Sequence, residues 1–272
     1  MTNKKIKIHV KNNHWAPGSF PTDAEGENNF TITKEHFDQA LNNFPEIKKK
    51  VEIFFDWDED NFKTSMANSD VLVAWNFSTT NLKKVAPNLK WIHIISAGVE
   101  HLHPLDWMFD DLVLTNSSGV HAKKAGEYGL MSILMLQNHM SKIITNQKNK
   151  SFVSLFSNPI AGKTVVLVGT GTLGASMAKL VAPLGVNIIG VNKRGRMTEG
   201  CSKVISVDKI DTVLPNADFL YLAVPETPET KNLISKERLN MLKSTCGIVN
   251  IGRQSVMDYD VLCKKLSNNE IA

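Results

Sequence analysis

A chain of 272 residues is long enough for one large or two ordinary domains, each with a buried core. Hydrophobic residues make up 42% of the sequence and charged residues 21%, as in soluble globular proteins, and the net charge of +4 comes from scattered lysines, which gives little support to a nucleic-acid partner. The three cysteines lack the spacing of a metal site or of disulfides, so we expect a cytoplasmic protein without a bound metal. The N-terminal stretch MTNKKIKIHV has no apolar signal core, and no apolar run approaches about 18 residues, so we expect no contact with a membrane.

The first part of the chain alternates between strand-like and helix-like patterns. Short β-branched or aromatic runs predict strands at residues 6–10, 51–55, 70–75, 91–96 and 112–116. Helix-like stretches lie between the first three strands, at 33–44 and 58–67, and Thr33 is the expected N-cap of the first, whose Phe37, Leu41 and Phe44 share a face. Because strands separated by helices form parallel crossovers, residues 1–117 are predicted to be an open α/β domain.

A long helix is predicted over residues 121–147, where apolar side chains crowd between Leu130 and Leu136. This density suggests burial between two domains, so we place the second domain at 118–272. A further series of strands is predicted at 163–169, 186–191, 203–207, 218–224 and 246–251, with a helix at about 172–183. The second domain is therefore also expected to contain a parallel sheet.

A glycine motif follows the first strand of that second sheet. Gly169, Gly171 and Gly174 form a G-x-G-x-x-G pattern that opens a predicted helix, with Thr172 and Leu173 between the last two glycines. The chemistry needs a tight turn, close approach of the backbone to a pyrophosphate, and a helix N-terminus that faces the phosphates. The pattern indicates dinucleotide binding, and an ordinary glycine-rich strand–helix turn is the alternative.

The next predicted strand bears on the choice of dinucleotide. An acid is expected about 20 residues further on, where it holds the ribose 2′-hydroxyl. Asn192 stands there instead, 18 residues after Gly174, and Lys193, Arg194 and Arg196 follow. An acid would repel a 2′-phosphate, whereas these cations can pair with one. The loop favours NADP over NAD, with a solvated basic loop as the alternative.

Taken together, five stretches, the glycine motif among them, resemble the D-isomer-specific 2-hydroxyacid dehydrogenase family. The resemblance rests on SAGVEHL (96–102), TNSSGVHAKKAGEYGLM (115–131), VGTGTLG (168–174), AVPETPETKNLISKERLNMLK (223–243) and VNIGRQSVMDYDVL (249–262). It covers residues from about 70 onward and is loose before that. The glyoxylate/hydroxypyruvate reductase branch is the most similar, because the basic loop recurs among its NADP-using members. The implied fold is α/β with two open parallel sheets: a flavodoxin-like substrate domain and a Rossmann dinucleotide-binding domain.

The resemblance also implies roles for individual residues. Val224 and Pro225 would border the adenosine, with Thr230 nearby, while Ile251 and Gly252 would pass beside the nicotinamide. Arg253 would bind the substrate, since a guanidinium can grip a carboxylate or carbonyl oxygen and stabilise charge in the transition state; a structural arginine at the strand end is the alternative.

In the first domain, the resemblance implies that the backbone N–H groups of Gly98 and Val99 receive the substrate carboxylate. Trp75 and Asn76 would be walls of the same cleft between the domains. The alternatives are that Trp75 is a core residue and that Gly98 only permits a turn.

One part of the family pattern is missing. In the family, the acid is a histidine paired with a glutamate, and both lie beyond the position of Ala272. Of the eight histidines, His93 is expected to be packed, His101 and His103 are possible substitutes near the carboxylate-binding turn, and His121 is expected to be structural. Glu270 lies too early for the glutamate role. We expect a C-terminally incomplete second domain of a longer enzyme; the alternative is a naturally short chain that cannot run the usual acid–base step.

The combined interpretation is an oxidoreductase that reduces a small 2-oxo acid, such as glyoxylate or hydroxypyruvate, with NADPH, or with NADH as the alternative. Hydride would pass from nicotinamide C4 to the carbonyl carbon. The resemblance implies a homodimer formed through the long helix. A dinucleotide-sensing, corepressor-like scaffold and a catalytically silent cofactor-binding fragment are the alternative hypotheses.

Overall fold

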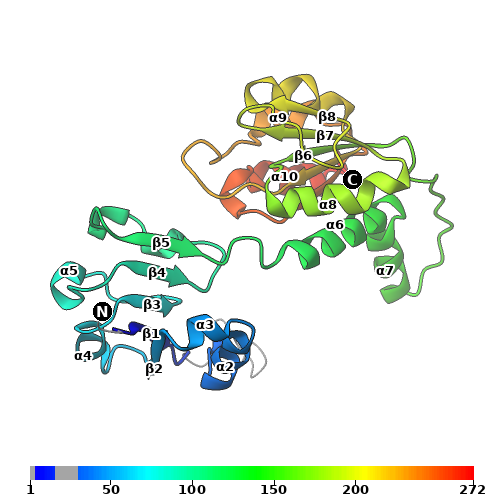
Figure 1. Cartoon of the computed structure of the whole chain (residues 1–272). Coiled ribbons are helices and arrows are strands. Elements are labelled where there is room, and N and C mark those ends of the chain that lie inside the picture. Colours follow the sequence, from blue (N-terminus) through cyan, green and yellow to red (C-terminus); the bar gives the residue numbers. More distant parts are fainter. Residues whose placement is uncertain (1–3, 16–29) are drawn as a thin grey trace. The chain divides into compact units, whose positions relative to one another are not determined.

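The computed structural model describes residues 4–15 and 30–272, and the chain divides into two compact units, Met1–Val120 and His121–Ala272. The division lies three residues from the boundary that the sequence predicts. Strands alternate with helices in each unit, as Figure 1 shows. All strand pairs are parallel among the described residues, so the prediction of an α/β fold with two parallel sheets is confirmed.

The first unit contains a sheet that runs in the order β2-β1-β3-β4-β5. Its described strands are β1 (Ile6–Asn12), β2 (Val51–Trp57), β3 (Val71–Ala74), β4 (Trp91–Ile94) and β5 (Val113–Asn116). This is the flavodoxin-like order, in which the chain turns from one side of β1 to the other. The carboxyl ends of β1 and β3 therefore form the switch point of the sheet, where ligands bind in this class of fold.

Helices cover both faces of the first sheet. They are α2 (Lys34–Asn42), α3 (Pro45–Lys48), α4 (Phe62–Met66) and α5 (Leu82–Val85), and two 3-10 turns follow β4, η1 (Glu100–Leu102) and η2 (Leu105–Trp107). Thr33 caps α2 as predicted: its side chain accepts a hydrogen bond from the His36 N–H. The second predicted helix is shorter than residues 58–67, and the predicted apolar face of the first ends early, because Phe44 lies beyond α2 and is 57% exposed.

The second unit contains a sheet in the order β10-β9-β6-β7-β8. Its described strands are β6 (Thr164–Val168), β7 (Asn187–Asn192), β8 (Lys203–Ser206), β9 (Phe219–Leu222) and β10 (Gly247–Asn250). Counted along the unit, this is the 3-2-1-4-5 order of a Rossmann fold, as the resemblance implies. The switch point lies at the carboxyl ends of β6 and β9.

The helices of this unit are α6 (Ala122–Gln137), α7 (Met140–Lys148), α8 (Thr172–Val181), α9 (Lys236–Met241) and α10 (Tyr259–Ser267). Short 3-10 turns complete it at η3 (Ala182–Leu184), η4 (Val207–Thr212), η5 (Leu214–Asn216) and η6 (Gln254–Val256). The prediction of one helix over 121–147 is wrong. His139 adopts φ of +55°, in the left-handed region, and this residue separates α6 from α7.

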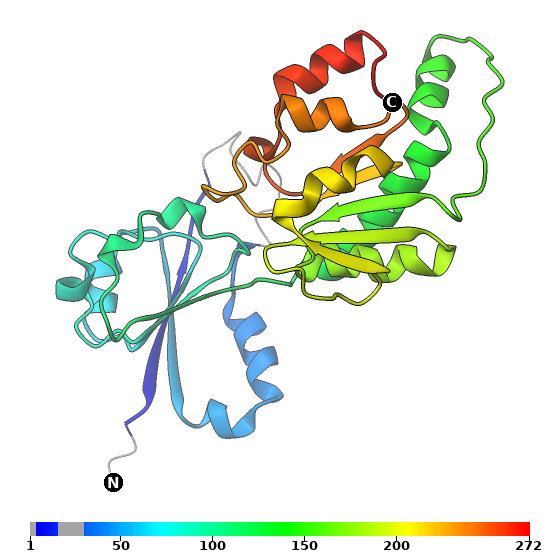
Figure 2. The same ribbon diagram turned by 90° about the horizontal axis from the view of Figure 1, so that it is seen from above.

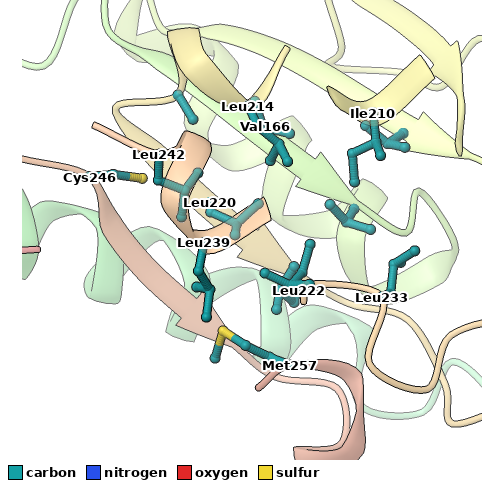
Figure 3. Close-up of a cluster of buried hydrophobic side chains, with 14 of the residues drawn as sticks. Val166, Ile210, Leu214, Leu220, Leu222, Leu233, Leu239, Leu242, Cys246 and Met257 are labelled. Carbon is teal, nitrogen blue, oxygen red and sulfur yellow. The ribbon is translucent and has the colours of Figure 1, made fainter. Parts of the chain in front are cut away.

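Each face of the second sheet has its own core. Val165 and Leu167 pack with Ile133 of α6 and Met177 of α8 on one face. On the other face, Val166 and its neighbours form a cluster with Leu239 of α9 and Leu262 of α10. Figure 2 shows the ribbons of these two helices, and Figure 3 shows Leu239 among the side chains of the cluster. Full burial of each such Val or Leu side chain stabilises the fold by about 1.5–3 kcal/mol. These two cores hold the carboxyl ends of the strands, and so the loops that follow them, in fixed positions.

Candidate functional site

The turn between β6 and α8 has the backbone geometry that the glycine motif predicts. Gly169 has φ of +95°, and a Cβ atom there would lie 2.6 Å from the carbonyl oxygen of Ala223. A Cβ atom on Gly174 would lie 2.0 Å from the carbonyl oxygen of Gly169. Only glycine therefore lets the start of α8 come this close to the turn.

The same turn leaves room for a ligand. A Cβ atom built on Gly171 meets no described atom within 4 Å, and Gly171 is the N-cap of α8. Thr172 and Leu173 form the first turn of that helix, where backbone N–H groups lack intrahelical acceptors. Open space in front of a helix N-terminus fits the pyrophosphate of a dinucleotide.

Asn192, at the end of β7, shapes the basic loop that follows it. Its Nδ2 donates hydrogen bonds to Thr170 Oγ1 and to the Arg196 carbonyl oxygen, both at 2.8 Å. Its Oδ1 accepts hydrogen bonds from the backbone N–H groups of Arg194 and Arg196, both at 3.1 Å. Both amide hydrogens are thus used within the chain, so the side chain orders the loop instead of offering a donor to a cofactor. The side chains of Lys193, Arg194 and Arg196 are exposed.

A third loop follows β9 and is folded by its own threonines. Thr230 Oγ1 donates to the Pro225 carbonyl oxygen at 2.7 Å and accepts from the Thr227 N–H at 2.8 Å. The pKa of Glu229 lies below its ordinary value, because its carboxylate accepts hydrogen bonds from its own N–H and from Thr227 and because Lys193 lies nearby. Thr230, predicted to lie near the cofactor, therefore holds this loop in shape. The charge of Lys193, which belongs to the basic loop, acts on Glu229 in this third loop.

The end of β10 passes close to that third loop. Ile251 is half-buried and donates its N–H to the Leu222 carbonyl oxygen at 3.0 Å. A Cβ atom on Gly252 would lie 2.6 Å from the carbonyl oxygen of Val224, so a larger residue would push the two segments apart. The structure thus brings Val224, Ile251 and Gly252 together at one edge of the sheet, next to the glycine turn at Gly169.

Arg253 is exposed and follows directly, and Asn250, which the sequence did not single out, holds its backbone. Asn250 Nδ2 donates to the Arg253 carbonyl oxygen at 3.1 Å and to the Tyr259 hydroxyl at 2.9 Å. Asn250 Oδ1 in turn accepts from the Gly252 N–H at 2.8 Å. An asparagine side chain commonly accepts a hydrogen bond from the backbone N–H two residues further on, as Asn250 does from Gly252, so a turn at NIGR could be predicted from the sequence.

In the first unit, the turn after β4 presents free backbone donors. Ser96 Oγ donates to the Gly98 carbonyl oxygen at 2.6 Å, and Asn116 Nδ2 donates to the Ala97 carbonyl oxygen at 2.7 Å. Within the described residues, the N–H groups of Gly98 and Val99 donate to no acceptor. These two amides are therefore held in place and available, as an anion receptor requires.

Trp75 and Asn76 follow β3. The Trp75 ring packs edge-on against Phe30, with ring centroids 4.8 Å apart, and lies over His101, whose Nε2 donates to the Trp75 carbonyl oxygen at 2.7 Å. Asn76 is exposed, and its Oδ1 lies 3.4 Å from Lys11 Nζ. Lys11, which no motif in the sequence marks, is almost fully buried, and burial lowers its pKa below the ordinary value.

The structure also places the other histidines that the sequence analysis names. His93 is half-buried, its Nδ1 lies 3.0 Å from Thr115 Oγ1, and burial lowers its pKa. His121 is the N-cap residue of α6. His101 and His103 line a cavity of the first unit together with Asn76.

Two negative findings concern the described part of the chain. Residues 4–15 and 30–272 contain no cluster of three His, Cys, Asp or Glu side chains arranged to hold a metal ion. No helix in those same ranges has both the length and the apolar character needed to cross a membrane.

Comparison with protein families gives a match over half of the chain. Residues 130–272 match the model of the D-isomer specific 2-hydroxyacid dehydrogenase, NAD binding domain. This range contains the glycine turn, the basic loop, the third loop and Arg253.

Comparison with individual proteins gives more distant relatives. The chain is 32% identical over 194 residues to a glyoxylate reductase of Thermofilum pendens, covering 69% of this chain and 57% of the relative. It is 27% identical over 202 residues to an erythronate-4-phosphate dehydrogenase of Shewanella baltica, covering 72% of this chain and 49% of the relative. The chain thus spans about half the length of these curated relatives.

A solved structure shares the fold. It is an NADPH-dependent glyoxylate/hydroxypyruvate reductase from Sinorhizobium meliloti in complex with NADP and sulfate, with a TM-score of 0.75 and 21% identity. The superposition covers 98% of this chain and 79% of that one.

Proposed function

This chain belongs to the D-isomer specific 2-hydroxyacid dehydrogenase family, and we propose that it transfers a hydride from NADPH to a small 2-oxo acid such as glyoxylate or hydroxypyruvate. The observation that carries the proposal is the pairing, at one edge of the second sheet, of a glycine turn open in front of α8 with a basic loop ordered by Asn192. The glycine turn suits a pyrophosphate, and the loop suits a 2′-phosphate.

NADPH, when bound, supplies the hydride. The residues of this chain bind and orient it: the N–H groups at the start of α8 receive the pyrophosphate, and Lys193, Arg194 and Arg196 receive the 2′-phosphate. The close approach of Gly252 to Val224 leaves no room for a side chain at this position, and we propose that Ile251 and Gly252 lie beside the nicotinamide.

The residues that bind the substrate carry positive charge or hydrogen-bond donors, which suit an anionic acid. The guanidinium of Arg253 binds a carboxylate or carbonyl oxygen and stabilises the negative charge that develops on the carbonyl as hydride arrives. Asn250 positions it through the backbone. The available N–H groups of Gly98 and Val99 bind the substrate carboxylate.

The test is NADPH oxidation, followed at 340 nm, with glyoxylate and hydroxypyruvate. Both the 272-residue chain and the full open reading frame through its stop codon should be assayed. We expect turnover from the full reading frame, and Arg253→Ala should lose about 100-fold or more in kcat/KM while retaining NADPH affinity. No turnover from the full reading frame with either acid would overturn the reductase proposal.

The same assay separates the dinucleotide-sensing scaffold from the reductase, because a scaffold binds NADPH without consuming it.

We also propose a homodimer, supported by two apolar side chains after α7 that are exposed to solvent, Phe152 at 94% and Phe156 at 88%. Light scattering at micromolar concentration should give twice the chain mass of 30.2 kDa, and a monomer would contradict this.

A further inference from the structure

A cavity of about 720 Å³ lies within the first unit, at the carboxyl ends of β1 and β3. This is the switch point of the sheet, where the strand order turns from β1-β2 to β3-β4-β5. Asn76 and His101 line it, and His101 follows Gly98 and Val99 after one intervening residue. A molecule as small as glyoxylate would fill only a small part of such a volume, since clefts of about 300–1,000 Å³ accommodate much larger ligands.

Lys11 organises the polar side of this cavity. Its side chain is 2% exposed, and its Nζ donates to Asn13 Oδ1 at 2.6 Å and to Asn76 Oδ1 at 3.4 Å. Since an ammonium group can only donate, it turns both amide oxygens toward itself and both NH₂ groups away. Within the described residues, neither NH₂ group has an acceptor, so both are available to a ligand oxygen.

The charges at the cavity disfavour a phosphate group on the carbon chain of the substrate. Lys11 is the only Lys or Arg among the described lining residues, and its Nζ lies 3.4 Å from Glu59 Oε1. Asp58, whose carboxylate pairs with His14 at 2.6 Å, and Asp106 add two more carboxylates. Hydroxyl groups suit this lining, because each can donate to a carboxylate and accept from an amide NH₂. Trp107 and Phe77 supply apolar walls for the carbon chain.

We propose that this cavity is a subsite for the hydroxylated carbon chain of a 2-oxo acid, and that it selects polyhydroxylated acids over phosphorylated ones. The inference rests on the proposed function for the identity of the acid, but the subsite belongs to the first unit alone. Lys11 is a positioning residue, which acts by holding the amides of Asn13 and Asn76.

Binding can be measured without turnover. All five tryptophans, Trp15, Trp57, Trp75, Trp91 and Trp107, lie in the first unit, so their fluorescence reports on it directly. The 272-residue chain is titrated with glyoxylate, with 2-oxogluconate, which carries a hydroxylated chain, and with hydroxypyruvate and its 3-phosphate ester. We expect 2-oxogluconate to bind at least tenfold more tightly than glyoxylate, and the phosphate ester to bind more weakly than hydroxypyruvate.

Variants assign the selectivity to this lining. Lys11→Met should reduce the preference for 2-oxogluconate over glyoxylate at least fivefold, with glyoxylate affinity changed less than threefold. Lys84→Met, on the exposed face of α5, is the matched control and should leave the preference unchanged. Asp106 is an exposed lining residue of the cavity, and Asp106→Lys should improve binding of the phosphate ester about tenfold. This test leaves the buried Lys11 in place.

Equal affinity of the parent chain for 2-oxogluconate and glyoxylate would overturn the subsite, as would an unchanged preference in a folded Lys11→Met variant. If Lys11→Met does not fold, the Asp106→Lys result decides, and no gain for the phosphate ester overturns the charge argument. Selective binding without NADPH oxidation by the full reading frame would refute the proposed function alone. NADPH oxidation without this selectivity would refute the subsite alone.

Discussion

Replacing Asn192 by aspartate should reverse the preference of this chain between NADPH and NADH. The substitution keeps an acceptor oxygen for the N–H groups of Arg194 and Arg196 but removes the two hydrogen bonds that Nδ2 donates, to Thr170 and to the Arg196 carbonyl oxygen. Two lost hydrogen bonds weaken the order of the loop by about 1–3 kcal/mol in total. The oxygen that replaces Nδ2 also faces a carbonyl oxygen, which adds repulsion.

The new charge acts directly on the cofactor. At a separation of about 6 Å and an effective dielectric constant of about 20, two unit negative charges repel by about 3 kcal/mol, roughly a 100-fold loss of affinity. NADPH carries the 2′-phosphate and suffers this loss, whereas the 2′-hydroxyl of NADH can donate a hydrogen bond to the aspartate. The ratio of NADPH to NADH affinity should therefore fall by about 100-fold or more.

Isothermal titration of the chain with each cofactor measures this ratio, and Asn187→Asp is the matched control. Asn187 begins the same strand, about 16 Å from Asn192 at about 3.3 Å per residue, which exceeds the screening length of about 8 Å at physiological salt. The control should leave the ratio unchanged. A folded Asn192→Asp variant that keeps the original ratio within threefold would refute the argument that this loop reads the 2′-phosphate.

Three further predictions concern stability and the glycine turn. Tyr221→Phe should stabilise the fold by about 1 kcal/mol in urea unfolding followed by circular dichroism, because the fully buried hydroxyl has no partner among the described residues and burial raises its pKa to about 12; a destabilised variant would contradict this. Gly174→Ala should abolish NADPH binding in the same titration as above, since its Cβ would lie 2.0 Å from the Gly169 carbonyl oxygen, and unchanged affinity would show that the turn is not the phosphate site. The pKa of His9 falls from 6.5 to about 4, because burial outweighs the pairing with Asp56, so the fold favours the neutral ring. The contribution of His9 to the free energy of unfolding is complete above about pH 6.5 and is lost as the pH falls through 4, a loss of up to about 3 kcal/mol. Tryptophan-detected urea unfolding should show this loss in the parent and a smaller one in His9→Gln, and equal losses would contradict the assignment.

The elements that the sequence predicts best are those specified by local chemistry. The strands that become β6 and β9 are continuous apolar runs, as parallel strands buried on both faces must be, and the glycine spacing after β6 places the turn and α8 with little ambiguity. Thr33 was recognisable as an N-cap for the same reason.

What the sequence could not predict depends on contacts made across the fold. The apolar pattern continues from α6 into Ile143 of α7, so periodicity alone cannot reveal the break that His139 makes in the left-handed region. A lysine in a strand normally indicates a solvent-facing position, yet Lys11 is buried because Asn13, Asn76 and Glu59 converge on it from three segments. Asn192 makes three hydrogen bonds within its own loop, and only the fourth, to Thr170, joins it to a residue distant in the sequence.

The most direct test of hydride transfer from NADPH to a 2-oxo acid is an isotope experiment. The protein encoded by the full reading frame is incubated with hydroxypyruvate and with NADPH that carries deuterium in place of the transferable hydrogen at C4. The product is examined by nuclear magnetic resonance. We expect glycerate of D configuration with deuterium at C2, formed at the rate of NADPH consumption. Consumption of NADPH without deuterium at C2, or NADPH binding without any product, would contradict it.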